Sequence, residues 1–299
     1  MMSLRDWTWI IALGAIWGCS FIFNAILIRE IGPLWVTSFR VGIGALGCWA
    51  VMIALRKSVP RDPKLWFQLA LLGVLAYAIP FALFPLAQAH LASGVAAIIN
   101  ALTPMVTALI SHVWIGGEKA TGTKFTGIGI GFVGAVLLVS PALSTGGSSA
   151  LWAIGACLGA TLCYGLSLNI TRSFKHIEPT AFASIALTGA AIISIPVAFF
   201  SEGAPVITRV ETWGAALAIG LISTAFTFQI MYRILPRVGA TNFATTTLIA
   251  PISALILGVT LLGETILPIQ IAGMLVIFFG LLFIDGRIST IWRAARPAG

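Results

Sequence analysis

The chain has 299 residues, of which 59% are apolar and only 9% are charged, with 17 Lys and Arg against 9 Asp and Glu. Soluble globular proteins carry about 25% charged residues, so this chain is too apolar to cover itself with a water-facing surface. Because the excess of apolar residues must face lipid, the composition indicates an integral membrane protein. It excludes a cytosolic enzyme, a nucleic-acid-binding protein and a disordered scaffold.

Apolar stretches of about 20 residues, the length that crosses the hydrocarbon core of a bilayer, follow one another along the chain. We predict ten of them, at residues 8–28, 34–55, 65–86, 94–115, 123–140, 151–171, 180–200, 212–232, 240–262 and 268–285. The basic start and apolar run of the first 20 residues resemble a signal peptide, but we expect this segment to be retained as the first span. Since the loops are short, the function must lie within the membrane.

The Lys and Arg residues predict the orientation of the ten spans, since cytoplasmic loops carry an excess of them. With a cytoplasmic N-terminus, fourteen of these residues lie inside and only Arg29 and Arg209 lie outside. We therefore expect a multi-pass protein of the bacterial cytoplasmic (inner) membrane with both termini in the cytoplasm.

The two halves of the sequence share a spacing pattern. Glu118, Gly127 and Gly134 recur 146 residues later as Glu264, Gly273 and Gly280. We predict a first five-helix repeat at 1–140, a flexible linker at 141–150, a second five-helix repeat at 151–286 and a cytoplasmic tail at 287–299. Because five is odd, the second repeat would insert upside down. Inverted repeats around a central cavity are the usual architecture of secondary transporters.

Several local features resemble the drug/metabolite transporter superfamily in its two-repeat EamA branch. They are Trp17-Gly18 followed by Phe21, Arg40 in the second span, and a Gly-Glu pair that ends spans 4 and 9. Tyr77 and the Asn100 to Pro104 segment look like the YddG-type amino-acid exporters, although those have an aromatic residue where this chain has Thr103. The resemblance implies efflux of a small metabolite, with aromatic and neutral amino acids as leading candidates and other drugs or metabolites as the alternative.

Arg40 is the only charged residue predicted to lie within a span, away from its first and last two residues. A charge at the bilayer centre costs roughly 2.5–3.5 kcal/mol on insertion scales, so its retention calls for an explanation. Either Arg40 faces the cavity and pairs with a substrate carboxylate, or it reaches the outer headgroups or backbone carbonyl groups.

Other polar and aromatic residues recur at helical spacing on several spans. The alternative for each Ser, Thr or Asn is a hydrogen bond that joins two helices. The predicted substrate-binding residues are Trp17, Phe21, Asn24, Arg40, Tyr77, Phe81, Asn100, Thr103, Tyr164, Thr224 and Thr246.

We expect no enzymatic activity, cofactor or metal, because no nucleophile motif or nucleotide-binding loop occurs and the three histidines are scattered. An integral-membrane enzyme is the alternative, but its acids would have to cluster at the cytoplasmic face. All nine acids lie at or beyond the ends of predicted spans, which favours transport without obligatory proton exchange. The expected partners are a small-molecule substrate and the bilayer, with no nucleic acid, and the oligomeric state, a monomer included, stays open.

Overall fold

The structure, a computed structural model, describes residues 3–115, 117, 119–145, 147–174, 176–231, 233–234, 238 and 246–284. Glu118, the beginning of the predicted ninth span and the predicted tail at 287–299 lie outside these residues. Every regular element of the described chain is a helix. The first half of the chain forms α1 (Leu4–Ile28), α2 (Pro33–Ala54), α3 (Pro63–Gly73), η1 (Val74–Ala78), α4 (Ile79–Gln88), α5 (Ser93–Asn100), α6 (Thr103–Val113) and α7 (Gly122–Thr145). The second half forms α8 (Gly147–Thr171), η2 (Arg172–Phe174), α9 (Pro179–Glu202), α10 (Val210–Leu217), η3 (Ala218–Phe226), α12 (Thr246–Leu262) and α13 (Pro268–Ile284).

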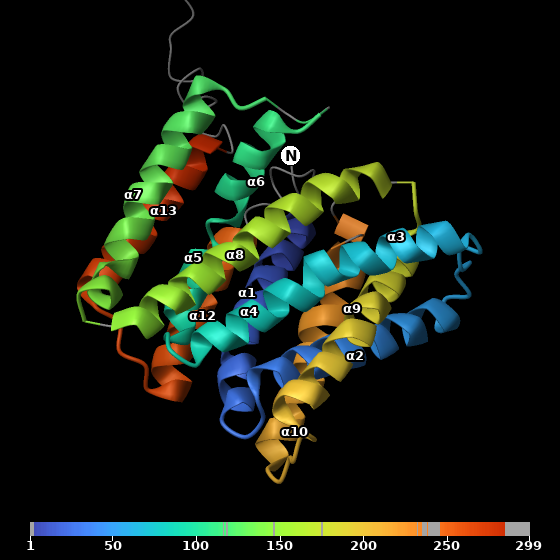
Figure 1. Cartoon of the computed structure of the whole chain (residues 1–299). Coiled ribbons are helices and arrows are strands. Elements are labelled where there is room, and N and C mark those ends of the chain that lie inside the picture. Colours follow the sequence, from blue (N-terminus) through green and yellow to red (C-terminus); the bar gives the residue numbers. More distant parts are fainter. Residues whose placement is uncertain are drawn as a thin grey trace, which may run out of the picture.

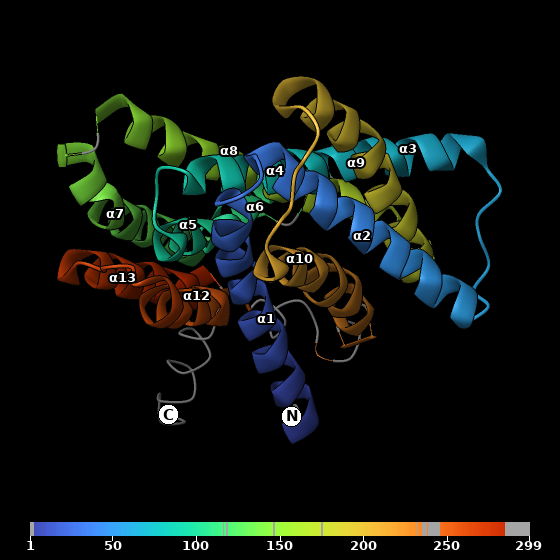
Figure 2. The ribbon, with the colours of Figure 1, turned by 90° about the horizontal axis from the view of Figure 1, so that it is seen from below.

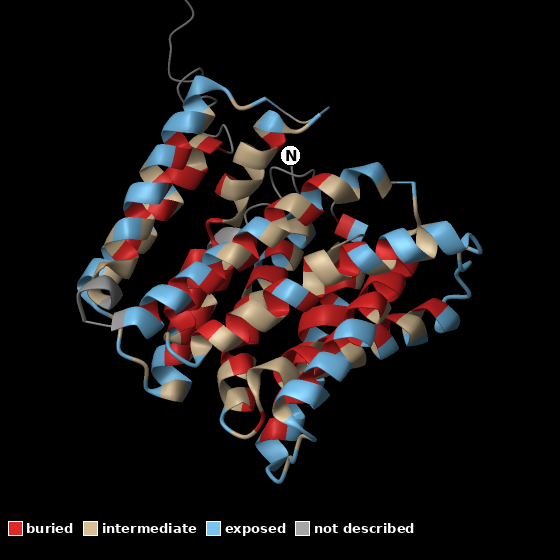
Figure 3. Cartoon of the chain, in the orientation of Figure 1, coloured by how far each residue is buried: buried red, intermediate tan, exposed pale blue. Residues whose placement is uncertain are grey.

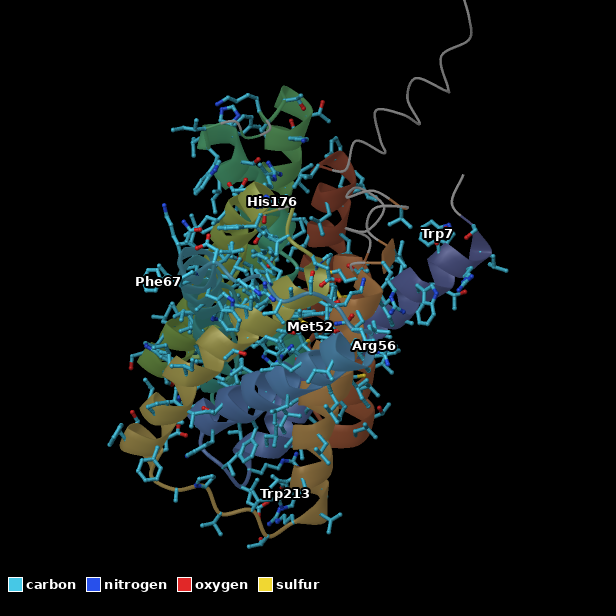
Figure 4. All side chains as sticks on the ribbon, turned by 90° about the vertical axis from the view of Figure 1, so that its right-hand side faces the viewer. Trp7, Met52, Arg56, Phe67, His176 and Trp213 are labelled. Atoms are coloured by element: carbon cyan, nitrogen blue, oxygen red, sulfur yellow. The ribbon has the colours of Figure 1, made fainter. Side chains whose placement is uncertain are left out.

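Within the described residues, eight helices are long and apolar enough to cross a membrane, and two shorter apolar helices lie at Ile249–Leu262 and Pro268–Ile284. Buried residues gather on the faces that the helices turn to one another, whereas exposed residues lie outside (Figure 3). Large apolar side chains are among the exposed ones: Phe67 is 71% exposed and lies at the outer edge of the molecule (Figure 4). An apolar outer surface needs lipid around it, so the protein is a multi-pass membrane protein.

The helices form two groups that meet at α1 (Figures 1 and 2). The long helices α7 and α13 lie side by side at one edge, and α2, α3 and α9 lie at the other. Between these edges, α1 packs along α12 and also contacts α10 and η3. The centre of the molecule is therefore bordered by helices from both halves of the sequence.

Glycines bring α7 and α13 into close contact. A Cβ atom on Gly127 would lie 2.6 Å from the carbonyl oxygen of Gly280, and a Cβ atom on Gly134 would lie 2.7 Å from that of Gly273. The two helices run antiparallel, because the earlier glycine of α7 meets the later glycine of α13. Small residues at such positions let helix backbones approach closely, which gives van der Waals contact where lipid supplies no hydrophobic driving force.

Three spans depart from regular α-helical geometry. The span from α3 to α4 contains the π-helical segment η1 just before Pro80, and the span that begins with α10 contains the longer π-helical segment η3. The span from α5 to α6 is interrupted at Ala101 and Leu102, just before Pro104. Proline lacks an N–H group and displaces the carbonyl four residues earlier, which accounts for the irregularities beside Pro80 and Pro104.

Helix N termini at one end of the molecule are capped locally. Ser3 accepts a hydrogen bond from the N–H of Asp6 in α1, Asp62 from that of Lys64 in α3, and Glu178 from that of Ala181 in α9. Each cap satisfies a backbone donor that the first turn of a helix leaves without a partner.

Glu30 instead binds backbone groups far away in the sequence. After α1, its Oε1 atom accepts hydrogen bonds from the N–H groups of Thr208 (2.6 Å) and Arg209 (3.1 Å), just before α10. The hydroxyl groups of Thr208 and Thr212, together with these N–H groups, lower the pKa of the Glu30 carboxyl from 4.5 to about 2. Charge-assisted hydrogen bonds of this kind favour the ionised form.

Close packing at Gly134 predicts different effects for two Gly→Ala substitutions on α7. Gly134→Ala forces its Cβ against α13 and should lower stability by roughly 1–3 kcal/mol. Gly129→Ala is the matched control, because a Cβ at Gly129 meets nothing within 4 Å. In thermal unfolding in detergent, Gly134→Ala should have a lower midpoint than the unchanged protein, and Gly129→Ala should have the same midpoint as the unchanged protein. Equal midpoints for the two variants would contradict the packing described.

The lowered pKa of Glu30 predicts how its contribution to stability depends on pH. A carboxyl whose folded-state pKa is depressed stabilises the fold above its ordinary pKa, and this contribution disappears as pH falls through the folded-state value. The unfolding midpoint of Glu30→Gln should therefore lie below that of the unchanged protein above pH 4.5, and the gap should close toward about pH 2. A gap that stays constant between pH 7 and pH 3 would refute this assignment.

Candidate functional site

Arg40 lies in α2 and turns its side chain toward α4 and η3. Its guanidinium carbon lies 3.7 Å from the centroid of the Phe81 ring, and its Nε donates a hydrogen bond to Thr224 Oγ1 at 3.3 Å. A cation over an aromatic face is attracted by the electron-rich ring, more strongly when water is excluded. Among the described residues, neither Nη group has a hydrogen-bonding partner. The structure therefore turns Arg40 into the bundle, and two of its nitrogen atoms keep their N–H groups available.

Phe81, the ring beneath this guanidinium group, belongs to a continuous row of six aromatic rings. Phe21 of α1 meets Phe84 of α4 edge to face at 5.4 Å, and Phe84 stacks on Tyr164 of α8 at 6.2 Å. Tyr164 meets Phe81 at 6.5 Å, and beyond Phe81 the row continues through Tyr77 to Phe228, at 5.7 and 5.4 Å between centroids. These separations suit favourable ring contacts, so helices from both halves of the sequence supply one aromatic surface.

The π-helical segment η3 places Thr224 beside Arg40. The Thr224 hydroxyl donates to the carbonyl of Ile219, five residues earlier, and accepts from Arg40. One turn further on, Thr227 accepts a hydrogen bond from the indole N–H of Trp17 at 3.2 Å. Irregular π-helical turns are frequent at functional sites, and here η3 carries Thr224, which faces Arg40 of α2, and ends just before Thr227, which faces Trp17 of α1.

Tyr164 adds a second polar group to this row of rings. Its side chain is half-buried, and its hydroxyl makes no hydrogen bond within the described part of the chain. The Tyr164 ring and the Arg40 guanidinium group both contact the Phe81 ring. Both side chains offer hydrogen-bond donors, so this surface is arranged to receive an acceptor.

The structure brings together six of the predicted residues through direct contacts or one shared ring: Phe21, Arg40, Tyr77, Phe81, Tyr164 and Thr224. Trp17 joins them through Thr227, which hydrogen-bonds the backbone of η3.

Asn24 lies nearer the end of α1, in a separate polar network. Its Nδ2 donates to Gln88 Oε1 at 2.9 Å, and Gln88 Nε2 donates to the Phe21 carbonyl oxygen at 2.7 Å and to Ser93 Oγ at 3.1 Å. The network joins α1, α4 and α5. Asn24 therefore makes a hydrogen bond that joins two helices, which is the alternative to substrate binding that we considered for it from the sequence.

Asn100 and Thr103 lie at the interruption between α5 and α6. Pro104 has no N–H with which to satisfy the Asn100 carbonyl four residues earlier. The Thr103 hydroxyl supplies the missing donor, at 2.7 Å from the carbonyl oxygen, and approaches Asn100 Oδ1 at 3.3 Å. Thr246, which begins α12, is fully buried and places its carbonyl oxygen against Gly14 of α1.

Phe84, Phe228 and Thr227 take part in the cluster, although the predicted set omits them. Phe84 lies seven residues after Tyr77 and three after Phe81, so helical spacing places it on the same face. Phe228 has no comparable signal in the sequence, because its ring partner Tyr77 lies in the other half of the chain.

An apolar groove of about 620 Å³ lies elsewhere, between α2 and α9. Leu46 and Ile192, which line it, are 71% and 64% exposed. Lipid chains fit such an outward-facing surface. In the described ranges, no group of three or more His, Cys, Asp or Glu is placed to hold a metal ion.

The chain belongs to the EamA-like transporter family, whose model matches residues 7–140 and 151–285. We call these segments the first and the second half. A transporter of Bacillus subtilis, YoaV, is 26% identical over 284 residues, which cover 91% of this chain and 94% of the relative. The inner membrane transporter YedA of Escherichia coli K12 is 25% identical over 286 residues, covering 91% and 88%.

A Salmonella typhimurium protein named "probable amino-acid metabolite efflux pump" is 23% identical over the full length of both chains. A solved crystal structure aligns with 95% of this chain and 98% of its own, with a TM-score of 0.70 and 15% identity. At that identity the structural match supports the fold alone.

Thr103→Ala should destabilise the protein, because it leaves the Asn100 carbonyl without its donor inside the membrane. An unsatisfied buried acceptor costs about 1–3 kcal/mol. Thr126→Ala is the control: the Thr126 hydroxyl donates to the carbonyl of Gly122 in the exposed first turn of α7, where no proline removes the backbone donor. Thermal unfolding in detergent measures both. If the two variants unfold at the same temperature, Thr103 does not serve as the replacement donor.

Proposed function

We propose that this protein exports small carboxylate-bearing metabolites with an apolar side chain, and that aromatic and neutral amino acids are its leading substrates. The observation that carries the proposal is the Arg40 guanidinium group, which lies over Phe81 and whose two Nη groups have no hydrogen-bonding partner among the residues that the structure describes. A carboxylate fits these two donors in a bidentate pair. The nearby rings then offer the substrate an apolar surface.

The positions of the acids favour an acceptor supplied by the substrate. The acids of the described chain, from Asp6 to Glu264, lie at or beyond helix ends. Arg40 therefore has no carboxylate of this chain to pair with among them. A net positive site repels organic cations, so carboxylate-bearing compounds are preferred. The ammonium group of an amino acid would be held by hydroxyl or carbonyl oxygens or by ring faces.

The proposed architecture is ten spans in two inverted repeats, at 1–140 and 151–286, joined by a linker at 141–150. Glycine contacts between α7 and α13 support it. The 146-residue offset relates Gly127 to Gly273 and Gly134 to Gly280, and in the structure Gly127 contacts Gly280 whereas Gly134 contacts Gly273. Such reciprocal contacts are what a two-fold axis produces. The antiparallel course of the two helices is what an inverted second repeat requires.

The π-helical segments support the same symmetry. Adding the 146-residue offset to the bounds of η1 gives residues 220–224, and all of these lie within η3. Two inverted halves around a central site can exchange conformations, which opens the site to one side and then to the other. The excess of Lys and Arg in alternate loops favours cytoplasmic termini.

We further propose that the substrate moves down its own gradient. Proton-coupled transporters generally place a carboxylate or histidine within the membrane to carry the proton. All nine acids lie at or beyond the ends of the predicted spans, and His112 lies only three residues from the end of its span, so an imposed pH gradient should leave the flux unchanged. The name of the Salmonella relative supports amino-acid metabolites as the class to test first.

Flux of labelled phenylalanine, methionine and threonine into proteoliposomes tests these proposals. We expect flux of at least one of them without a pH gradient, and a loss of affinity of about 10- to 100-fold in Arg40→Gln, since each tenfold change corresponds to about 1.4 kcal/mol. Arg40→Lys should recover part of the affinity, because it keeps the charge but not the bidentate geometry. Arg29→Gln, a surface change, is the control.

Preference for a quaternary ammonium compound over every amino acid would overturn the substrate class. Steep dependence on the pH gradient would overturn the facilitator mechanism. Equal affinity in Arg40→Gln and the unchanged protein would remove Arg40 from the site.

A further inference from the structure

Glu202, the last residue of α9 in the second half, caps a helix of the first half. Its Oε1 and Oε2 accept hydrogen bonds from the N–H groups of Leu34 (3.1 Å) and Trp35 (3.2 Å), in the first turn of α2. The N-cap residue of α2 is Gly32, which has no side chain with which to cap. A Cβ atom at Gly32 would lie 2.1 Å from Glu202 Oε2, so the carboxylate occupies the space of the missing side chain.

Glu264 repeats this arrangement at a second helix. Following α12 in the second half, it accepts hydrogen bonds from the N–H groups of Ser93 (2.8 Å) and Gly94 (3.3 Å), at the start of α5 in the first half. The N-cap residue of α5 is Ala92, which makes no capping hydrogen bond. A carboxylate at a helix N-terminus gains from both the free N–H groups and the helix dipole.

Glu30 makes the third such contact, with the roles of the two halves reversed. Here the carboxylate belongs to the first half, and the N–H groups that it binds precede α10 in the second half. Arg209, the N-cap residue of α10, makes no side-chain capping bond of its own. The turns that follow α1 and α12 and the loop that leads into α10 all lie along the lower edge of the molecule (Figure 1). Three carboxylates therefore tie the two halves together at one end.

The opposite end is held differently in the described part of the chain. There α1, α3 and α9 are capped by neighbouring residues of their own sequence. The halves meet through side chains, as in the ion pair of Lys57 with Glu178 at 3.5 Å and the hydrogen bond of Arg172 with Ser111 at 3.0 Å. Contacts between two flexible side chains adapt to relative movement, whereas a carboxylate bound to two backbone N–H groups requires one position.

We propose that Glu30, Glu202 and Glu264 are the gate residues of this transporter: they hold one end of the two halves closed, and that end opens when their bonds to backbone N–H groups are released. The inference rests on the alternating-access mechanism proposed above. It also connects the gate with the substrate site, because α2 carries the Glu202 contact in its first turn and Arg40 less than two turns later. A tilt of α2 that frees its N-terminus must move Arg40 relative to Phe81 and Thr224.

Distances between spin labels across the gate test this proposal without any substrate. One pair of labels is placed at Ala89 and Thr265, beside the Glu264 contact, and another at Arg29 and Ala204, beside the Glu202 contact; all four residues are exposed. The four native cysteines are first replaced by alanine. Electron–electron double resonance on protein in liposomes then measures the distance distribution for each pair.

Glu202→Gln and Glu264→Gln each remove the charge and one of the two acceptor oxygens. We expect a longer distance to become populated at least about tenfold more than in the unchanged protein, which corresponds to about 1.4 kcal/mol. Gly32→Ala should have the same effect at the Glu202 contact, because its Cβ displaces the carboxylate without changing any charge. Its φ of −66° suits alanine, so the change introduces no backbone strain.

Glu211→Gln is the matched control, since Glu211 lies in the first turn of α10 at the same end and belongs to none of these contacts. The proposal fails if the distance distributions of Glu202→Gln, Glu264→Gln and Gly32→Ala match that of the unchanged protein. It also fails if Glu211→Gln lengthens the distances as much as they do. The substrate proposal is judged by flux alone, so each can fail without the other.

Discussion

Every backbone N–H and C=O group that lies in lipid must find its partner inside the protein, and the rest of this structure follows from that requirement. It explains why all regular elements of the described chain are helices. It also explains how the interruptions are tolerated. The Thr103 hydroxyl replaces the donor that Pro104 lacks, and the Thr224 hydroxyl bonds a carbonyl within the widened turn of η3. At the helix ends, the same requirement gives the acidic residues their positions.

Arg40 carries a charge within the helix bundle, and its surroundings reduce the cost of that charge without neutralising it. Phe81 lies under the guanidinium group and Thr224 accepts one hydrogen bond. Removing a partner from a buried charge is costly, so a site with donors to spare favours a ligand that brings an acceptor. The carboxylate of the proposed substrate would gain from the same low-dielectric surroundings that make a charge without a counter-ion unfavourable.

Close packing at glycines holds the edge formed by α7 and α13. Between α7 and α13, glycine backbones lie in direct contact, so that interface is formed by shape and resists substitution. Near the centre, α2 and η3 also pack closely at Gly44 and Gly220, and polar bonds such as those of Trp17 with Thr227 and Arg40 with Thr224 add to this packing. Glycine packing is therefore common to this edge and to the centre, and the centre adds polar bonds between helices.

The sequence by itself determined the class of this protein, because composition and span length leave a chain in lipid few choices. It also predicted family membership from the Trp17, Arg40 and Gly-Glu features, and the EamA match at residues 7–140 and 151–285 confirms it. Helical spacing identified the face of Tyr77 and Phe81, since that periodicity is local. What only the tertiary structure decided are partners far apart in sequence. The Phe228 ring packs against Tyr77, Asn24 hydrogen-bonds Gln88, and three glutamates bind N–H groups at the N termini of distant helices. The reason is that periodicity reports which side of a helix is polar, whereas the partner that meets that side depends on how the helices pack.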